Sequence, residues 1–260
     1  IGQIANAGTN SFYLDFKDSS NVGNDASGLS NNFTVNNLTS IDQSTDTCVE
    51  NFATWNAVLR MNSTMEFSDG NLTGKTASNY ASDASNSFFS TIGVSQGKWY
   101  AEFKYVSSTT NDGSFIGIAY DLNKQQGGGT TIHNFCQSIP EGYGYAPQGE
   151  VFNNGGTTGY STYTTGDIIG VAMDLDNNTL NFYKNGSSAG NQVSITADKE
   201  YYFALSDGTS SNTFTYSANF GSPPYSISSG NSDANGFGNF EYPVPSGYYA
   251  LNTSNLNTYG

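Results

Sequence analysis

The acidic residues are the first candidates for chemistry in this sequence, because cleavage of a glycosidic bond requires two carboxyl groups beside that bond. In retaining hydrolysis the two groups lie about 5–5.5 Å apart, a spacing that alternating acids on one strand provide. Glu102, Glu150 and Glu241 each stand alone, and the closest alternation is that of Asp174 and Asp176. That pair lies where a strand-like run enters a turn, so we interpret it as stabilising the turn. The sequence therefore predicts no catalytic residue and argues against an enzyme.

Metal binding and nucleophilic catalysis have few candidates. His133 is the single histidine, and it lies three residues before Cys136. These two side chains are half of the four ligands that structural zinc requires, and no third group is apparent that would order them for catalysis. The Asp174–Asp176 alternation lacks the ordered series of oxygen ligands found in a calcium loop. We therefore expect no metal and no other cofactor.

Recognition has a better candidate in residues 141–167, where aromatic residues alternate with Gly, Asn and Thr. Rings that offer an apolar face and a polar tip, beside amides and hydroxyls, are typical of surfaces that recognise sugars or proteins. The alternative is that several of these rings pack in a core, which we favour for Tyr143 and Tyr145 and leave open for Tyr160 and Tyr163. The predicted ligand-binding residues are Tyr160, Tyr163, Asn153, Asn154, Tyr145 and Phe152.

The elements that must position these groups are β-strands. Residues 168–175 alternate apolar with small or mixed side chains, and the alternation resumes at residues 179–184 after Asp176, Asn177 and Asn178. Two alternating runs joined by Asp and Asn, which tolerate left-handed backbone angles, predict a β-hairpin. Similar short runs separated by turn residues recur from about residue 65 to 223, which is the spacing of a β-sandwich.

Composition supports an all-β chain and limits its partners. Aromatic residues make up 14% of the 260 residues and charged residues only 12%, a mixture that favours strands over helices. The formal net charge of −14 argues against nucleic acid as a partner. No apolar run approaches the roughly 20 residues of a membrane-spanning helix, and the start lacks the layout of a signal peptide. Cys48 and Cys136 allow one disulfide bridge, but we favour two free thiols.

Changes of pattern along the chain predict three segments. Residues 1–60 hold an extended N-terminal strand and a linker rich in Asn, Ser and Asp; residues 61–225 form the sandwich; residues 226–260 form an irregular tail that leads to a next module. The chain opens on Ile1, and we expect it to be a piece of a longer protein.

The order of the strand-like runs resembles the SPRY domain. The runs that carry the resemblance are "GKWYAEFKY", "IGIAYDL", "YGYAPQGEVFNNG", "GDIIGVAMDLDNNTLNFYKNG" and "YYFALSDGTSSNTFTYSANFG". The resemblance implies a two-sheet antiparallel sandwich of the concanavalin-like, jelly-roll type with partner-binding loops at its edges. It also implies a structural core made of Trp99, Phe103, Ile169, Val171, Leu180 and Phe182. The insertion "NKQQGGGTTIHNFCQSIPEG" departs from the pattern between two expected strands.

The flanks resemble the surroundings of this sandwich in large virion proteins of tailed bacteriophages. The segments concerned are "GTNSFYLDFKDSSNVGNDASGLSNNFTVNNL", "DTCVENFATWN" and "PSGYYALNTSNL". This resemblance implies a location on the virion surface, without membrane insertion, and other virion subunits as partners, with a homo-oligomer expected.

The sequence is therefore compatible with three functions. The first is a non-enzymatic virion surface or tail-fibre module, an adhesin with a lectin-like fold, that binds a host glycan or protein. The second is a structural decoration or connecting domain that contacts only other virion subunits. The third, a glycan-cleaving enzyme, is disfavoured by the missing carboxylate pattern.

Overall fold

A computed structural model describes residues 8–39, 43, 50–59, 65–76, 86–109, 113–125, 134–137, 139–207 and 213–260. The chain divides into two compact units, residues 1–45 and residues 46–260. The predicted domain boundaries after residues 60 and 225 stay predictions. His133 and Cys48 lie outside the described residues, and Cys136 is a buried free thiol.

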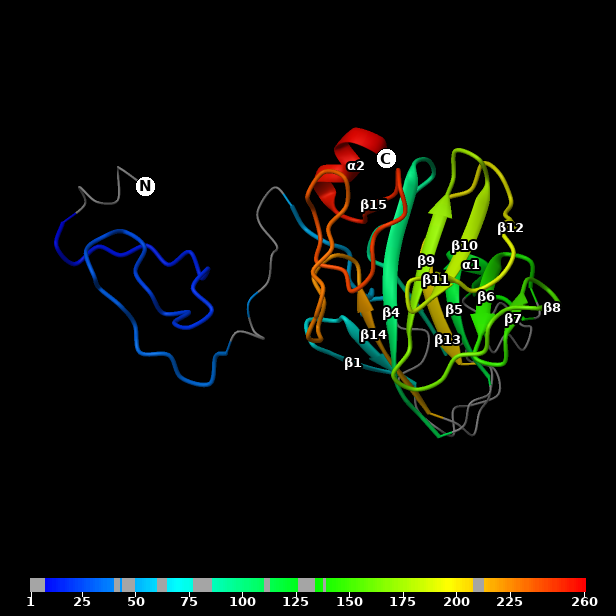
Figure 1. The fold of residues 1–260 in the computed structure, drawn as a ribbon, viewed down its shortest axis with the longest axis horizontal. Helices are drawn as coiled ribbons and strands as arrows, with labels where there is room; N and C mark the ends of the chain where they lie inside the picture. Colours follow the sequence, from blue (N-terminus) through cyan, green and yellow to red (C-terminus); the bar gives the residue numbers. More distant parts are fainter. Residues whose placement is uncertain are drawn as a thin grey trace. The chain divides into compact units, whose positions relative to one another are not determined.

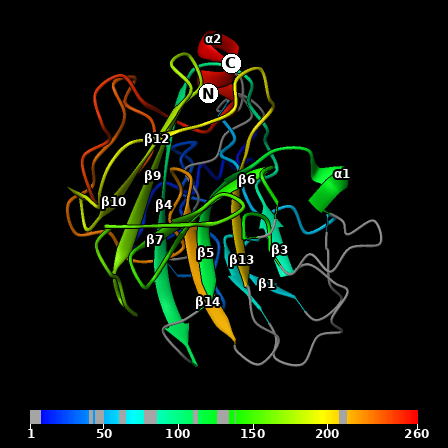
Figure 2. The same cartoon turned by 90° about the vertical axis from the view of Figure 1, so that its right-hand side faces the viewer.

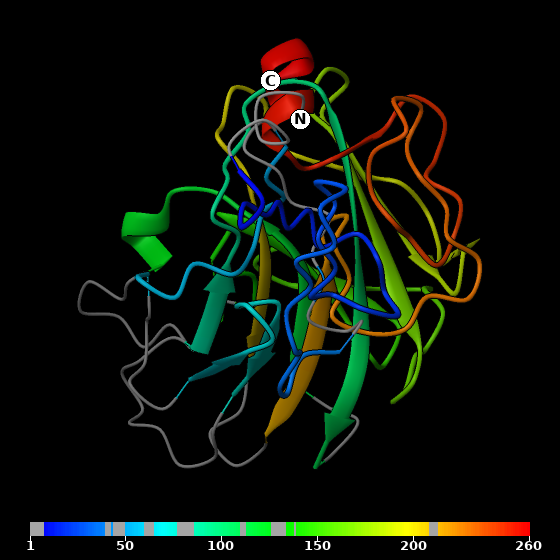
Figure 3. The same ribbon diagram turned by 90° about the vertical axis from the view of Figure 1, so that its left-hand side faces the viewer.

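The first sheet lies in the larger unit and contains nine strands among the described residues, in the order β1-β2-β14-β4-β9-β10-β11, with β12 paired to β10 and β15 paired to β4. All of its pairs are antiparallel except β15 with β4. Figure 3 shows β1 and β2 beside β14. Its strands are β1 (Glu66–Ser68), β2 (Thr73–Lys75), β4 (Lys98–Ser108), β9 (Ile168–Asp174), β10 (Thr179–Lys184), β11 (Ser187–Ser188), β12 (Val193–Ser194), β14 (Phe214–Asn219) and β15 (Tyr249–Ala250).

The second sheet contains six described strands in the order β3-β13-β5-β6-β7-β8, all antiparallel. Its strands β5, β13 and β3 run side by side in Figure 2, and β8 forms the last strand of one edge. The strands are β3 (Asn86–Phe89), β5 (Ser114–Ala119), β6 (Gly142–Ala146), β7 (Glu150–Phe152), β8 (Gly156–Thr158) and β13 (Tyr202–Asp207). Two short helices complete the described elements, α1 (Leu122–Gln125) and α2 (Thr253–Tyr259).

The two sheets pack face to face through aromatic side chains, which confirms the predicted antiparallel sandwich. Phe103 of β4 lies 6.0 Å from Phe203 of β13 between ring centroids, and Phe182 of β10 lies 5.1 Å from Tyr145 of β6. Each pair therefore joins one sheet to the other. The six residues predicted for the core are at most 2% exposed: Trp99, Phe103, Ile169, Val171, Leu180 and Phe182. No helix of the described residues is long and apolar enough to cross a membrane.

The β9–β10 hairpin forms where the sequence predicts it. Asp174 pairs with Thr179 across the turn, and its carboxylate accepts hydrogen bonds from the backbone and side-chain nitrogens of Asn177, at 3.0 and 2.9 Å. Lys98 adds an ion pair to the same carboxylate at 2.9 Å. Asn178 takes the left-handed backbone conformation, with φ of 54°, which Asn tolerates better than most residues. These contacts give Asp174 the turn-stabilising role.

The C-terminal segment packs against the first sheet, and Figure 1 shows β15 and α2 next to β4. Its attachment centres on the fully buried Glu102 of β4, with the donors that surround it, which we call the Glu102 clamp. Oε1 accepts from the backbone N–H of Tyr242 at 2.8 Å and from the Tyr100 hydroxyl at 3.2 Å. Oε2 accepts from the backbone N–H of Glu241 at 2.9 Å and from the Asn219 amide at 3.4 Å. A solitary acid in the sequence is thus a structural anchor.

A second buried carboxylate, that of Asp233, holds the same segment from within. It accepts hydrogen bonds from the backbone N–H groups of Asn235, Phe237 and Ala250, and from the side-chain amide of Asn255. The distances run from 2.7 to 3.0 Å. The residues after 225 are therefore irregular over most of their length, but polar contacts hold them in place. The hydrophobic pattern of the sequence does not predict these contacts.

The smaller unit is organised by one side chain rather than by strands. Its backbone pairing in the described residues is an isolated bridge between Leu14 and Asp25 instead of the expected extended strand. The Asp25 carboxylate accepts from the backbone N–H groups of Tyr13, Ser27 and Asn31 at 2.8 to 2.9 Å. These bonds occupy backbone donors that a strand ladder would use, which favours loops.

Candidate functional site

Two of the predicted ligand-binding tyrosines lie inside the sandwich. Tyr145 is fully buried and Tyr163 is 3% exposed, with 4.9 Å between their ring centroids. The Tyr163 hydroxyl donates to the backbone carbonyl of Tyr145 at 3.0 Å, and the Tyr145 hydroxyl donates to the carbonyl of Ser161. Burial raises the pKa of both phenols. These rings support the surface from below rather than forming it.

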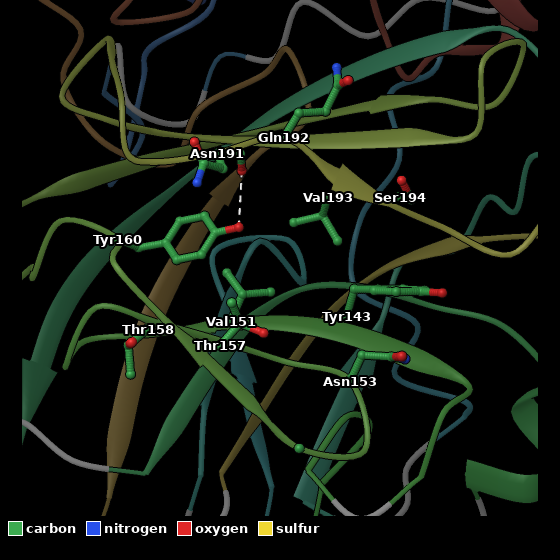
Figure 4. A pocket seen from close by; sticks show the side chains of 11 residues that line it. Tyr143, Val151, Asn153, Thr157, Thr158, Tyr160, Asn191, Gln192, Val193 and Ser194 are labelled. Atoms are coloured by element: carbon green, nitrogen blue, oxygen red, sulfur yellow. Dashed lines mark hydrogen bonds between the residues drawn. The ribbon is translucent and has the colours of Figure 1, made fainter.

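Tyr160 and Asn153 lie together at a surface pocket of about 360 Å³, which we call the Tyr160 pocket (Figure 4). It opens where β7 and β8, at the edge of the second sheet, face the segment containing β12 of the first sheet. Its apolar lining comes from Val151 and Val193. The complete lining is Tyr143, Val151, Asn153, Gly155, Thr157, Thr158, Tyr160, Asn191, Gln192, Val193 and Ser194.

Hydrogen bonds to the main chain fix the side chains on both sides of the pocket. The Asn153 amide nitrogen donates to the carbonyls of Pro140 and Gly142, at 2.8 and 2.9 Å, so its orientation is determined. The Tyr160 hydroxyl donates to the carbonyl of Asn191 at 3.0 Å, a bond drawn in Figure 4. This bond joins the loop after β8 to the segment before β12.

Close packing holds the Tyr160 ring in place as well. A Cβ atom added at Gly190 would lie 2.4 Å from the ring, so a residue larger than glycine would displace it. Tyr145 packs against the ring from the core, with 5.9 Å between centroids. Burial raises the pKa of the Tyr160 phenol, which therefore stays neutral at neutral pH.

The two remaining predicted residues do not line the pocket. Phe152 packs edge-to-face against Phe115 of β5, with 5.2 Å between centroids. Asn154 is exposed and takes a positive φ of 50°, and its backbone N–H donates to the carbonyl of Cys136 at 2.8 Å. It belongs to the turn that leads into β8.

Sequence reasoning missed the wall of the pocket formed by residues 191–194. This segment lies about thirty residues after Tyr160 and contains no aromatic residue. The available signal was the "GNQ" run, in which Gly190 precedes two amide side chains. That signal is weak because such runs are common in a chain this rich in Gly and Asn.

The lining of the Tyr160 pocket contains no acidic and no basic side chain. Neither Glu102 nor Asp174 lies there; both are occupied in structural contacts. Among the described residues, no three His, Cys, Asp or Glu side chains group as metal ligands would. The chemistry that the pocket can perform is hydrogen bonding by amides and hydroxyls beside an aromatic ring.

Comparison with known proteins adds a family match to this geometry. The SPRY domain model matches residues 98–218, from the start of β4 into β14. Among solved structures, the chain is similar to the SPRY domain of human HERC1, at 18% identity and a TM-score of 0.49, over 63% of this chain and 96% of that one. The PSpry domain of TRIM65 gives 11% identity and a TM-score of 0.46, over 64% and 92% of the two chains. No significant match is found among curated protein sequences.

Stonustoxin is a third similar structure, at 15% identity and a TM-score of 0.48, with 64% of this chain matched to 27% of the toxin chain. SPRY domains are typically protein–protein interaction modules and are generally non-catalytic. The sandwich that carries the Tyr160 pocket thus contains, at residues 98–218, a segment that matches the SPRY domain family.

Proposed function

We propose that this chain is a non-catalytic recognition module of a bacteriophage virion, on its surface or in a tail fibre, and that it binds a host glycan or protein through the Tyr160 pocket. One observation carries the proposal: an open pocket joins the edges of both sheets, and hydrogen bonds hold two of its lining side chains, the Tyr160 ring and the Asn153 amide, in fixed positions. Such concave sites with a few placed polar groups are the usual form of ligand-binding sites.

The fixed geometry favours binding because little conformational freedom remains to be lost when a ligand arrives. Asn153 is held by two carbonyls, and Tyr160 by one hydrogen bond and by Gly190. Behind them the buried rings of Tyr145 and Tyr163 resist displacement. A rigid frame that displays polar groups at its edge is the arrangement expected of a recognition surface.

We propose binding without cleavage of the ligand because of where the acidic side chains lie. Hydrolysis of a glycan requires two carboxyl groups beside the bound sugar, whereas the Tyr160 pocket is lined by none. Glu102 accepts four hydrogen bonds inside the protein, and Asp174 closes a turn. The site is therefore suited to holding a ligand rather than to cleaving it.

The virion setting is supported by the flanking sequences, which resemble those around this sandwich in tailed-phage virion proteins. The same setting supplies an alternative function, a connecting or decoration domain that contacts other virion subunits, including copies of itself. A specific observation favours that alternative: four of the large exposed hydrophobic side chains lie in the smaller unit, namely Phe12, Phe16, Phe33 and Leu38. Exposed apolar groups of this kind are typical of contact surfaces.

Adsorption to isolated bacterial envelopes, prepared from a panel of strains, tests the proposal. We expect the intact chain to adsorb to at least one preparation, and Tyr160→Ala to adsorb about 10-fold less, because an aromatic contact at a binding site contributes on the order of 1–2 kcal/mol. Tyr249→Ala serves as the matched control, since Tyr249 is a half-buried tyrosine that stacks on Tyr259 outside the pocket.

Two results would overturn the proposal. Equal adsorption of the folded Tyr160→Ala variant and the parent would remove the pocket from binding and favour the connecting role. Sustained release of reducing ends from the envelopes, abolished by the change of one acid, would make the chain an enzyme.

A further inference from the structure

We infer that the Tyr160 pocket takes a neutral, hydroxyl-rich polysaccharide segment rather than an anionic polymer or a protein. The inference rests on the proposed function and decides between the two ligand classes left open there. It follows from the charge of the lining, from the polar atoms that remain available, and from the distribution of exposed apolar side chains.

The charge of the pocket lining and of the whole chain disfavours an anionic ligand. None of the side chains that line the Tyr160 pocket is acidic or basic, and burial raises the pKa of the Tyr160 phenol, which keeps it neutral. A uronate, sulfate or phosphate on a ligand would find no cation to pair with. The formal net charge of −14 would also repel an anionic polymer as it approaches. Anionic glycans are thus disfavoured both at a distance and in contact.

The polar atoms that remain available at the pocket suit the hydroxyl groups of a sugar. Both N–H groups of the Asn153 amide are bound by main-chain carbonyls, and the described residues offer no partner to its Oδ1, which remains as an oriented acceptor. The side-chain amides of Asn191 and Gln192 are exposed, also without a partner among the described residues. Each of these two can donate and accept at once. A sugar hydroxyl also donates and accepts, so neighbouring hydroxyls on one ring match such amides.

The Tyr160 ring is the third element. The ring lies beside these amides, and the bond from its hydroxyl to the Asn191 carbonyl holds it there. In Figure 4 the face of the ring is turned nearly toward the viewer. Gly190 packs against the ring. A sugar carries its C–H groups on the faces of the ring and its hydroxyls around the rim. It can therefore stack on Tyr160 while its rim hydroxyls reach the amides of Asn191 and Gln192.

The surroundings of the pocket disfavour a protein ligand. Protein interfaces usually bury about 1,200–2,000 Å² around a core of apolar or aromatic anchors. The large hydrophobic side chains that are exposed in the described residues are Phe12, Phe16, Phe33, Leu38, Val58 and Val106, and none of them lines this pocket. The site has the size and polarity to hold one or two sugar rings.

Binding of the intact chain to immobilised polysaccharides tests the inference. The neutral set is dextran, mannan and galactan, and the charged set is alginate and dextran sulfate. We expect binding to at least one neutral polymer that is unchanged between about 0.05 and 0.5 M salt, because only interactions between charges are screened. Gln192→Ala should weaken it about 3- to 10-fold, the loss of one or two hydrogen bonds. Gln96→Ala, which removes an exposed amide outside the pocket, should leave it unchanged.

Binding to no neutral polymer, or to the charged set alone, would overturn the inference. The envelope assay separates this failure from failure of the proposed function. One set of results would show that the pocket recognises a protein and that the neutral-glycan inference is wrong. In that case Tyr160→Ala abolishes adsorption, and the parent chain no longer adsorbs to envelopes treated with protease but still adsorbs to envelopes treated with periodate. If Tyr160→Ala leaves envelope adsorption intact, the proposed function itself is wrong.

Discussion

The Glu102 clamp and the Tyr160 pocket are two polar regions of the same sandwich that use their polar groups in opposite ways. Both oxygens of Glu102 receive two donors each, and the side chain is fully buried. At the Tyr160 pocket, internal bonds fix Asn153 and Tyr160, while the amides of Asn191 and Gln192 remain exposed. Polar groups whose hydrogen bonds are all made inside the protein hold the fold together, whereas those with unused donors and acceptors are available to a ligand.

The largest effect on stability is expected in the core between the two sheets. Phe182 is 2% exposed and packs against Tyr145 across the sandwich. Phe182→Ala should lower the free energy of unfolding by about 3–5 kcal/mol, because a large cavity is left in packed surroundings. Val106→Ala on β4, where the side chain is 40% exposed, should cost less than about 1 kcal/mol. Equal losses in denaturant melts would contradict the core assignment.

The second largest loss in the free energy of unfolding is expected at the Glu102 clamp. Glu102→Ala leaves two partly buried backbone N–H groups, those of Glu241 and Tyr242, without their acceptor. Each unsatisfied group costs about 1–3 kcal/mol when it is fully buried. Because these two groups are only partly buried, we expect a loss in the lower part of the summed range, about 2–4 kcal/mol, in urea melts. Glu66→Ala removes an exposed acid that pairs with Lys75, and it should cost less than about 1 kcal/mol. A clamp variant as stable as the parent would mean that the C-terminal segment is held without Glu102.

The clamp also predicts a pH dependence. Burial raises the pKa of Glu102 in the folded protein despite the bonds it accepts, so the folded state keeps its proton to higher pH than the unfolded state. The contribution of Glu102 is therefore most favourable below the unfolded pKa and is lost as pH rises through the folded pKa. The stability of Glu102→Gln relative to the parent should increase over that interval. Urea melts of both proteins between pH 4 and 8 measure the difference, and no change with pH would contradict it.

The Tyr160 pocket should show the smallest effects on stability. Asn153→Ala removes two bonds to main-chain carbonyls and should cost about 1–2 kcal/mol. Gln192→Ala removes an exposed amide and should change stability by less than about 0.5 kcal/mol. A larger loss for Gln192→Ala in thermal melts would show that this amide supports the fold and would end the contrast with the Glu102 clamp.

The strands of the sandwich could be predicted from the sequence because alternation is a local signal. The β9–β10 hairpin forms with its turn at Asn177 and Asn178, as the residue types indicate. The short strands β8, β12 and β15 carry too few residues for alternation to be visible. They form because neighbouring strands provide hydrogen-bonding edges: β7 for β8, β10 for β12 and β4 for β15.

The candidate site was predictable only in part, because its residues meet across long separations. The run of aromatic and Asn residues predicted Tyr160 and Asn153 as site residues. It did not show that Tyr163 turns inward to contact Tyr145. The pairing of Tyr160 with Asn191 depends on how the two sheets meet. The same holds for Glu102, since three of its four partners lie more than one hundred residues later in the chain.

We expect the Tyr160 pocket to bind ligand with polar groups that the fold does not need. The most direct measurement is the dissociation constant of Gln192→Ala for an envelope preparation that the parent binds, taken beside its melting temperature, with Gln96→Ala as control. We expect binding about 3- to 10-fold weaker for Gln192→Ala at an unchanged melting temperature, and parental binding for Gln96→Ala. Parental binding by Gln192→Ala, or weaker binding matched by an equal loss in Gln96→Ala, would contradict it.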